Sequence, residues 1–351
     1  MGKFVCVRIP QANDIDLTKF QFDYDLTFAA FFMNADGTIY GRFGTRSSRE
    51  EATEDITLEG FAESLAGALK LHERYPANKQ YLAAKQGQPI RFKTPNDLPA
   101  LRGKYKAKIE YGSQSVKSCM HCHQISDAER LTFRTAGKPI PDKLLYPYPM
   151  PDVIGIELNA RTRATVSEVK SNSAADRAGL KTGDKILTAN GQAILALADV
   201  QWVLHHAEDT DQFSLRVLRD NNTTDLTVKL ESGWRRATDI AWRVSSWDLR
   251  RMGTGGLLVT PATGEDRRQA SVDDSKMALL VKHVGQYGAH AVAKKAGFQK
   301  GDVIISFDGQ SDLVTDSALL GYAAQHTKPG DKINVVVKRG AQRLELKLLM
   351  Q

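Results

Sequence analysis

One segment of the chain occurs twice. Residues Ala178–Gln192 and Ala296–Gln310 share the pattern A-G-x-x-x-G-D-x-I-x-x-x-[N/D]-G-Q, and matching positions are always 118 residues apart. This separation is far above the roughly 20–50 residues of solenoid repeats. The second half of the chain is therefore predicted to fold as two copies of one domain.

The repeated segment carries turn and close-packing residues. Each copy has an Ala-Gly pair, which permits close backbone approach, and ends in a hairpin-turn pair, Asn190-Gly191 or Asp308-Gly309. These residues resemble PDZ domains of the bacterial type, and Phe213–Asp220 and Lys328–Gly340 are similar to the last strands of that fold. The resemblance implies that each copy binds an extended C-terminal peptide by adding it as a strand to a sheet edge.

The same resemblance implies a set of peptide-binding residues. In the first copy, a loop would hold the peptide carboxylate and a helix within Ala198–Ala207 would form the opposite wall. The second copy departs from the family by a polar insertion, Pro261–Lys276, which puts its peptide binding in doubt. The implied residues are Val153, Ile154, Gly155, Ile156, Leu197 and Gln201 in the first copy, and Gly255, Gly256 and Leu257 in the second.

A C-x-x-C-H motif, Cys119–His123, precedes the repeated domains. This spacing is typical of covalent c-type haem, with Cys119 and Cys122 as thioethers and His123 as the iron ligand. Met150, held between prolines, is the candidate second ligand to the iron. A zinc half-site, a thioredoxin-type redox pair and a motif without function remain alternatives.

The first 85 residues or so have an α/β pattern. Strands are expected over Phe4–Ile9, Leu26–Phe32 and Thr38–Gly44, with a helix over Leu58–His72. The order resembles the latter part of a thioredoxin-like fold, and the whole chain resembles bacterial thioredoxin-like, PDZ-containing proteins, some of them selenoproteins. The resemblance implies that a strand, a redox motif and an export signal are encoded upstream of the first residue.

Composition narrows the choice of function. The chain of 351 residues has a net charge of +7, and its basic residues are spread widely, which argues against nucleic acid. No apolar run approaches the roughly 18 residues of a membrane span, and three cysteines argue against a disulfide framework. Basic residues between Arg91 and Lys117 form either a solvated face or a rim that steers an acidic electron-transfer partner.

Taken together, the patterns predict a multidomain α+β protein. Its expected parts are a truncated thioredoxin-like α/β module (1–85), a haem-binding segment (86–150), a first PDZ domain (151–232), a Trp/Arg-rich connector (233–252) and a second PDZ domain (253–351), both PDZ domains being β-sandwiches or barrels. The expected function is that of an exported, periplasmic or extracytoplasmic electron-transfer protein with haem c, and the alternative is a non-catalytic PDZ scaffold. No nucleophile elbow or Ser, His and Asp grouping is visible in the sequence.

Overall fold

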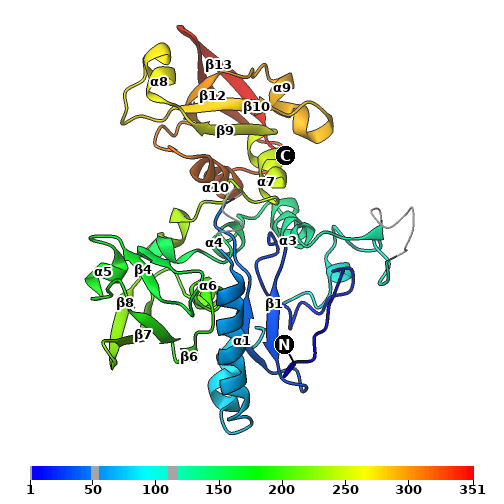
Figure 1. Ribbon diagram of the computed structural model, residues 1–351. Helices are drawn as coiled ribbons and strands as arrows, with labels where there is room; N and C mark the ends of the chain where they lie inside the picture. Colours follow the sequence, from blue (N-terminus) through cyan, green and yellow to red (C-terminus); the bar gives the residue numbers. More distant parts are fainter. Residues whose placement is uncertain (1, 49–54, 110–117) are drawn as a thin grey trace. The chain divides into compact units, whose positions relative to one another are not determined.

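The computed structural model describes residues 2–48, 55–109 and 118–351. They form two compact units (Figure 1). Unit 1 holds the chain up to Ile125 together with Tyr146–Thr238, and unit 2 holds Ser126–Leu145 together with Asp239–Gln351. Each unit thus combines one copy of the repeat with a segment from earlier in the chain.

The amino-terminal part of unit 1 contains the expected hairpin and helix. Strands β1 (Ala30–Met33) and β2 (Ile39–Phe43) pair antiparallel, and α1 spans Leu58–His72 as predicted. The helix begins where the Thr57 side chain accepts the N–H of Gly60, because this hydroxyl satisfies a backbone donor of the first turn. An apolar cluster between hairpin and helix includes buried Phe32 and Phe43.

The strand expected over Phe4–Ile9 is not formed, so this prediction is wrong. Val5 and Val7 are 94% and 82% exposed, and the sheet of β1 and β2 has only two strands among the described residues. Alternating β-branched residues favour a strand only where a neighbour supplies backbone partners. The amino-terminal module is therefore a hairpin and a helix, and a thioredoxin-like fold is not shown.

The first copy of the repeat is a small β-rich domain in unit 1. Its core contains Ile186, Val203, Phe213 and Val217, all nearly inaccessible to solvent. Sheet β6-β5-β7-β8 and hairpin β3-β4 surround this core. The elements are η4 (Pro151–Ile154), β3 (Ile156–Leu158), β4 (Val166–Val169), α5 (Ala174–Arg177), β5 (Lys185–Ala189), β6 (Gln192–Ala193), α6 (Leu197–His206), β7 (Gln212–Arg219) and β8 (Asn222–Lys229).

The second copy, in unit 2, follows the same order. Its strands form one sheet, β13-β12-β11-β10-β9, and the polar insertion forms a short helix, α8, whose first turn is capped by Thr263. The elements are α7 (Ser246–Thr254), β9 (Leu257–Pro261), α8 (Gly264–Ala270), β10 (Leu279–Val284), η6 (Gly288–Ala291), α9 (Val292–Lys295), β11 (Val303–Phe307), α10 (Asp316–His326), β12 (Lys332–Arg339) and β13 (Gln342–Leu349).

The repeat motif has the same structural role in both copies. The turn residues Asn190 and Asp308 have φ of 46° and 51°, and the glycine after each is also left-handed, as two-residue hairpin turns require. The aspartate of Gly-Asp is buried and pairs with a late-strand arginine: Arg219 with Asp184 and Arg339 with Asp302.

The segment between the hairpin module and the first copy is mostly short helices. It contains η2 (Lys79–Lys85), η3 (Pro95–Asp97), α3 (His123–Thr135) and α4 (Asp142–Leu145). In unit 2, Arg134 of α3 is 2% exposed and donates to the carbonyls of Thr327, Met252 and Gln351. The end of α3 is therefore an integral part of unit 2.

The Trp/Arg-rich connector includes η5 (Trp234–Ala237) and the start of α7. A Trp–Arg contact lies within the connector, with the Arg235 guanidinium 4.6 Å from the Trp234 ring centre. Arg235 also donates to the carbonyls of Leu204 and Ala207 at the end of α6. In unit 1 the connector thus caps a helix of the first copy.

Candidate peptide-binding groove

Strand β3 offers an open edge. Among the described residues it pairs only with β4. The Lys170 N–H donates to the Gly155 carbonyl, and the Asn159 N–H donates to the Thr165 carbonyl. Because bonded residues alternate along an antiparallel ladder, the backbone groups of Ile156 and Leu158 point to the other side. This edge can accept one further strand.

The loop before β3 is shaped by a left-handed glycine. Gly155 has φ of 85°, and a Cβ there would lie 2.1 Å from the Cβ of Ser173. Its N–H already donates to the Asp152 carbonyl. Gly155 is thus a structural residue, and the Ile156 N–H is the donor that the open edge presents. The side chains of Ile154 and Ile156 are in the core, at 1% and 2% exposure.

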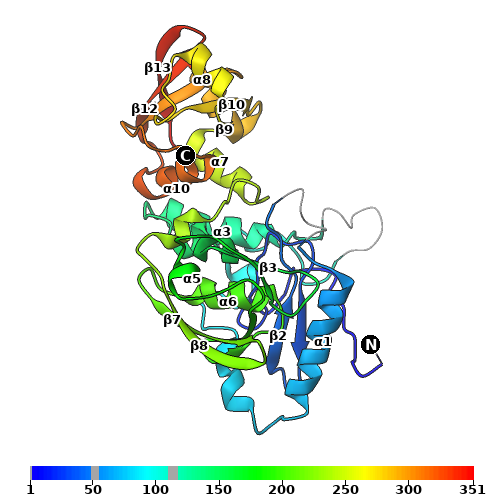
Figure 2. The ribbon, with the colours of Figure 1, turned by 60° about the vertical axis from the view of Figure 1, so that its left-hand side comes forward.

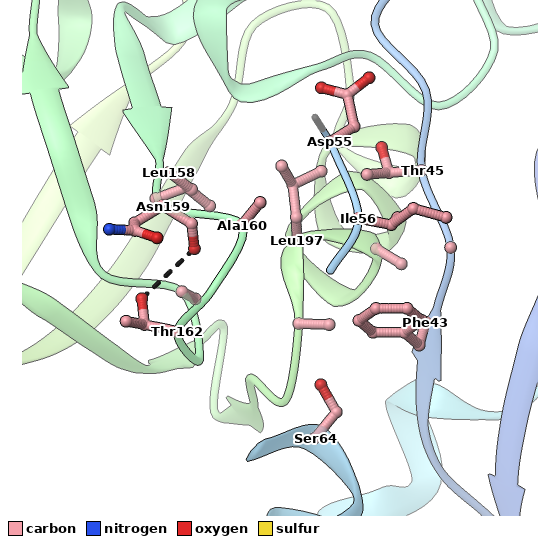
Figure 3. A pocket seen from close by; sticks show the side chains of 14 residues that line it. Phe43, Thr45, Asp55, Ile56, Ser64, Leu158, Asn159, Ala160, Thr162 and Leu197 are labelled. Atoms are coloured by element: carbon pink, nitrogen blue, oxygen red, sulfur yellow. Dashed lines mark hydrogen bonds between the residues drawn. The ribbon is translucent and has the colours of Figure 1, made fainter. Parts of the chain in front are cut away.

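The opposite wall is α6, and a pocket lies between it and β3. The pocket contains about 330 Å³ of empty space and is lined by Leu158 and Leu197 of the domain and by Phe43 and Ile56 of the amino-terminal module. Figure 3 shows Leu197 between Leu158 on one side and Phe43 and Ile56 on the other. Leu197 is therefore where the sequence expectation places it, beside the groove.

Gln201, also expected to face a peptide, is instead bonded within the protein. It is 4% exposed, its amide donates to the Tyr148 carbonyl, and its side-chain oxygen accepts the hydroxyl of Thr45 at 2.7 Å. The amino-terminal module therefore covers the carboxyl-terminal half of α6. No signal in the sequence indicated that α6 would contact Thr45, Phe43 and Ile56. These residues are more than 100 positions from α6 in the chain.

A buried ion pair joins α6 to the amino-terminal module. Lys85 Nζ lies 2.8 Å from Asp199 Oδ1, and both side chains are 1% exposed. Burial lowers the pKa of Lys85, and Asp199 opposes that shift. The indole N–H of Trp202 donates to the Ala84 carbonyl at 2.9 Å. Figure 2 shows α6 beside the hairpin strand β2.

The second copy differs at the corresponding place. Gly255 and Gly256 form the loop, but Gly253 and Thr254 belong to α7. The Thr254 hydroxyl lies 3.0 Å from the Arg250 carbonyl and 3.2 Å from the carbonyl of Leu257, whose position matches Ile156 in the first copy, and can donate to either. Helix α7 packs against α10, the wall of this groove, through close contact of Gly253 with Ala323.

An ion pair reinforces the contact between α7 and α10. Arg250 of α7 binds the carboxylate of Asp316 at the start of α10. Burial raises the pKa of Asp316 to about 6, and Arg250 opposes the shift. The helix wall of the second groove is thus covered by the chain's own preceding helix.

The four residues expected to bind haem have other surroundings. Met150 is in unit 1, and its Sδ accepts the Gln201 amide at 3.3 Å and lies 3.3 Å from the Thr45 hydroxyl. Its thioether is therefore engaged by a protein donor. Cys119 and Cys122 are partly exposed free thiols, and His123 is the first residue of α3. Burial raises the pKa of the Cys122 thiol, which keeps it in the less reactive thiol form.

Two findings concern metals and membranes within residues 2–48, 55–109 and 118–351. No cluster of three or more His, Cys, Asp or Glu side chains is positioned to hold a metal ion. No helix in this part of the chain has both the length and the apolar character for a membrane crossing.

Curated relatives overturn the electron-transfer prediction. A probable periplasmic serine endoprotease DegP-like of Pseudomonas savastanoi pv. phaseolicola is 30% identical over 151 residues, covering 42% of this chain and 29% of that protein. A probable periplasmic serine protease do/HhoA-like of Haemophilus influenzae is 39% identical over 153 residues, covering 44% and 29%. The predictions of haem c, of electron transfer and of an acidic electron partner are wrong, because the relatives are named as proteases.

The chain spans less than a third of the length of these two relatives. A solved structure of the HtrA-type protease AlgW with decapeptide is similar at 19% identity, with a TM-score of 0.25, covering 41% of this chain and 49% of that one. The family model described as PDZ domain matches residues 152–230 and 272–350. Both copies of the repeat are therefore PDZ domains, and the chain carries two of them.

Proposed function

We propose that the chain binds extended peptides with a free C-terminus in the groove of its first PDZ domain. The observation that carries this proposal is the open edge of β3 beside the pocket lined by Leu158 and Leu197. A peptide paired antiparallel with β3 would bond to the backbone groups of Ile156 and Leu158. Its terminal carboxylate would lie at the Val153–Ile156 loop and accept the N–H of Ile156.

The pocket gives the proposed peptide a side-chain preference. Its walls come from Leu158, Leu197, Phe43 and Ile56, which are apolar. Burying an apolar side chain contributes about 25 cal/mol per Å² removed from water. We therefore expect peptides with a branched aliphatic residue facing this pocket to bind more tightly than peptides with a charged residue there.

The test is a calorimetric titration of the full chain with a free-acid peptide and its amidated twin. A charge-assisted hydrogen bond contributes about 1.5–3 kcal/mol, so amidation should weaken binding by about tenfold or more. Leu197→Arg, which fills the pocket, should abolish binding. Ser167→Arg on the exposed face of β4 is the matched control and should bind normally. Equal affinity for the two peptides would show that the groove does not recognise the terminal carboxylate.

A scan with backbone N-methyl groups tests the added strand itself. Because Ile156 and Leu158 both face the groove, only alternate peptide N–H groups should pair with β3. Methylation at alternate positions should weaken binding, and methylation at the positions between them should not. A uniform effect along the peptide would contradict strand addition.

The second PDZ domain is not assigned this role. Its equivalent backbone carbonyl, that of Leu257, lies 3.2 Å from the Thr254 hydroxyl, and α7 covers its groove helix. The predicted residues Gly255, Gly256 and Leu257 would bind peptide only after α7 moved away. A calorimetric titration of the full chain should therefore give one bound peptide per chain.

The relatives' names add two further proposals. The first is that this chain acts in the periplasm, as its relatives are named to do. The second is that the chain, or a longer protein containing it, hydrolyses proteins. Incubation of the purified chain with casein and a fluorophosphonate probe tests this second candidate, because an active serine would become labelled. Absence of both labelling and hydrolysis would exclude proteolysis by this chain.

A further inference from the structure

The Arg42 side chain of β2 is buried without a full set of partners. It is 3% exposed, and its guanidinium lies 3.5 Å from the centre of the Trp202 ring. Its Nε donates to the Gln21 carbonyl at 3.1 Å. Nη1 and Nη2 have no hydrogen-bond partner among the described residues. A guanidinium presents these two groups as a planar fork that matches a carboxylate.

The charges around Arg42 do not balance it. One buried carboxylate close to Arg42, that of Asp199, pairs with the ammonium of Lys85 and accepts only the backbone N–H of Arg42. Two cationic side chains therefore share one carboxylate inside unit 1. Burial lowers the pKa of Arg42 to about 10, so the group keeps its charge at neutral pH. A buried charge without a counter-ion costs free energy, and an anion beside Nη1 and Nη2 would offset that cost.

Arg42 lines a second pocket, which adjoins the groove pocket at Phe43, Gly44 and Ala198. Phe22, Leu26 and Phe31 form part of the apolar wall of this pocket. Tyr148 and Gln201 complete its lining on the side of α6. Asp23 also lines it, and its carboxylate accepts the backbone N–H of Asp25 at 3.1 Å. A pocket with an apolar wall and a few polar side chains is a common form of small-ligand site.

We propose that this pocket binds a small organic carboxylate, with the carboxylate on Nη1 and Nη2 of Arg42 and an apolar or aromatic group against Phe22, Leu26 and Phe31. Either a free acid or the carboxyl group of a peptide supplies this chemistry. The site shares Phe43 with the groove pocket, but β3 and Leu197 are not part of it.

Benzoate and its neutral isostere benzamide are the probes, each titrated into the full chain by calorimetry. Benzoate should bind saturably and about tenfold or more tightly than benzamide, because only the carboxylate forms two charge-assisted bonds. Arg42→Lys keeps the charge but not the fork and should weaken benzoate binding. Ala29→Phe fills the pocket without changing Arg42 and should abolish binding, and Ser167→Phe on exposed β4 is its size-matched control.

The outcomes separate this site from the peptide groove. Leu197→Arg should abolish peptide binding and leave benzoate binding unchanged. If benzoate displaces a free-acid peptide, the carboxylate in the pocket comes from the peptide; if both bind together, the ligand is a free acid. Equal affinity of the wild-type chain for benzoate and benzamide overturns the proposal. So does the absence of a saturable heat signal when benzoate is titrated into the folded wild-type chain.

Discussion

The buried pair of Lys85 and Asp199 allows one prediction to be worked out quantitatively. Asp199→Ala removes the carboxylate that pairs with the Lys85 ammonium, and this ammonium is 1% exposed. Removing one member of a buried ion pair lowers the free energy of unfolding by about 3–5 kcal/mol, because the other charge stays buried without its partner. Asp199 also accepts the N–H groups of Arg42 and Leu195 at 3.2 and 2.9 Å. Each orphaned N–H adds about 1 kcal/mol.

A second variant separates the two causes of this destabilisation, the unpaired buried charge and the lost hydrogen bonds. Lys85→Met together with Asp199→Ala removes both charges and keeps an apolar chain of similar length in the buried site. The ionic cost then disappears, while the two orphaned N–H groups remain. The double variant should therefore regain about 3 kcal/mol relative to Asp199→Ala alone.

Hydrogen exchange followed by mass spectrometry is the suitable assay, because it reports each unit separately. Peptides from α6 and β2 should exchange faster in Asp199→Ala and slower again in the double variant. Peptides from β12 of unit 2 serve as the internal control and should not change. If the double variant is as destabilised as Asp199→Ala, the stranded ammonium is not the cause and the reasoning is refuted.

Three further results are expected. Gly155→Ala should lower the melting temperature of unit 1 more than Gly183→Ala, because both positions have positive φ but only the first places a Cβ 2.1 Å from Ser173; equal losses would contradict the clash. Burial raises the pKa of Glu129 to about 7, so between about pH 4.3 and pH 7 the folded chain holds a proton that the unfolded chain releases, and the free energy of unfolding should fall as pH rises. In urea titrations, Glu129→Gln should reduce the dependence of the free energy of unfolding on pH. An unchanged dependence would show that another group causes it. Arg134→Ala should destabilise unit 2 by about 2–4 kcal/mol in urea unfolding, because three buried carbonyls lose their donor, and a loss under about 1 kcal/mol would show that water replaces it.

Local patterns in the sequence predicted the elements that depend on neighbouring residues. The repeat motif located both PDZ domains, because its turns need left-handed residues at fixed places, and Asn190 and Asp308 adopt them. The helix Leu58–His72 followed from apolar residues at helical spacing. The C-x-x-C-H motif misled the functional prediction, because five residues in sequence carry no information about what surrounds them in space.

The sequence by itself determined the two PDZ domains, the hairpin and the helix of the amino-terminal module. Only the tertiary structure decided that Gln201 is bonded to Thr45, that α7 covers the second groove, and that Arg42 lies buried against Trp202 with two N–H groups unpaired. The physical reason is that turns and helix caps depend on residues a few positions apart. These contacts instead join residues 66 to 160 positions apart, where the identity of one residue does not constrain the other.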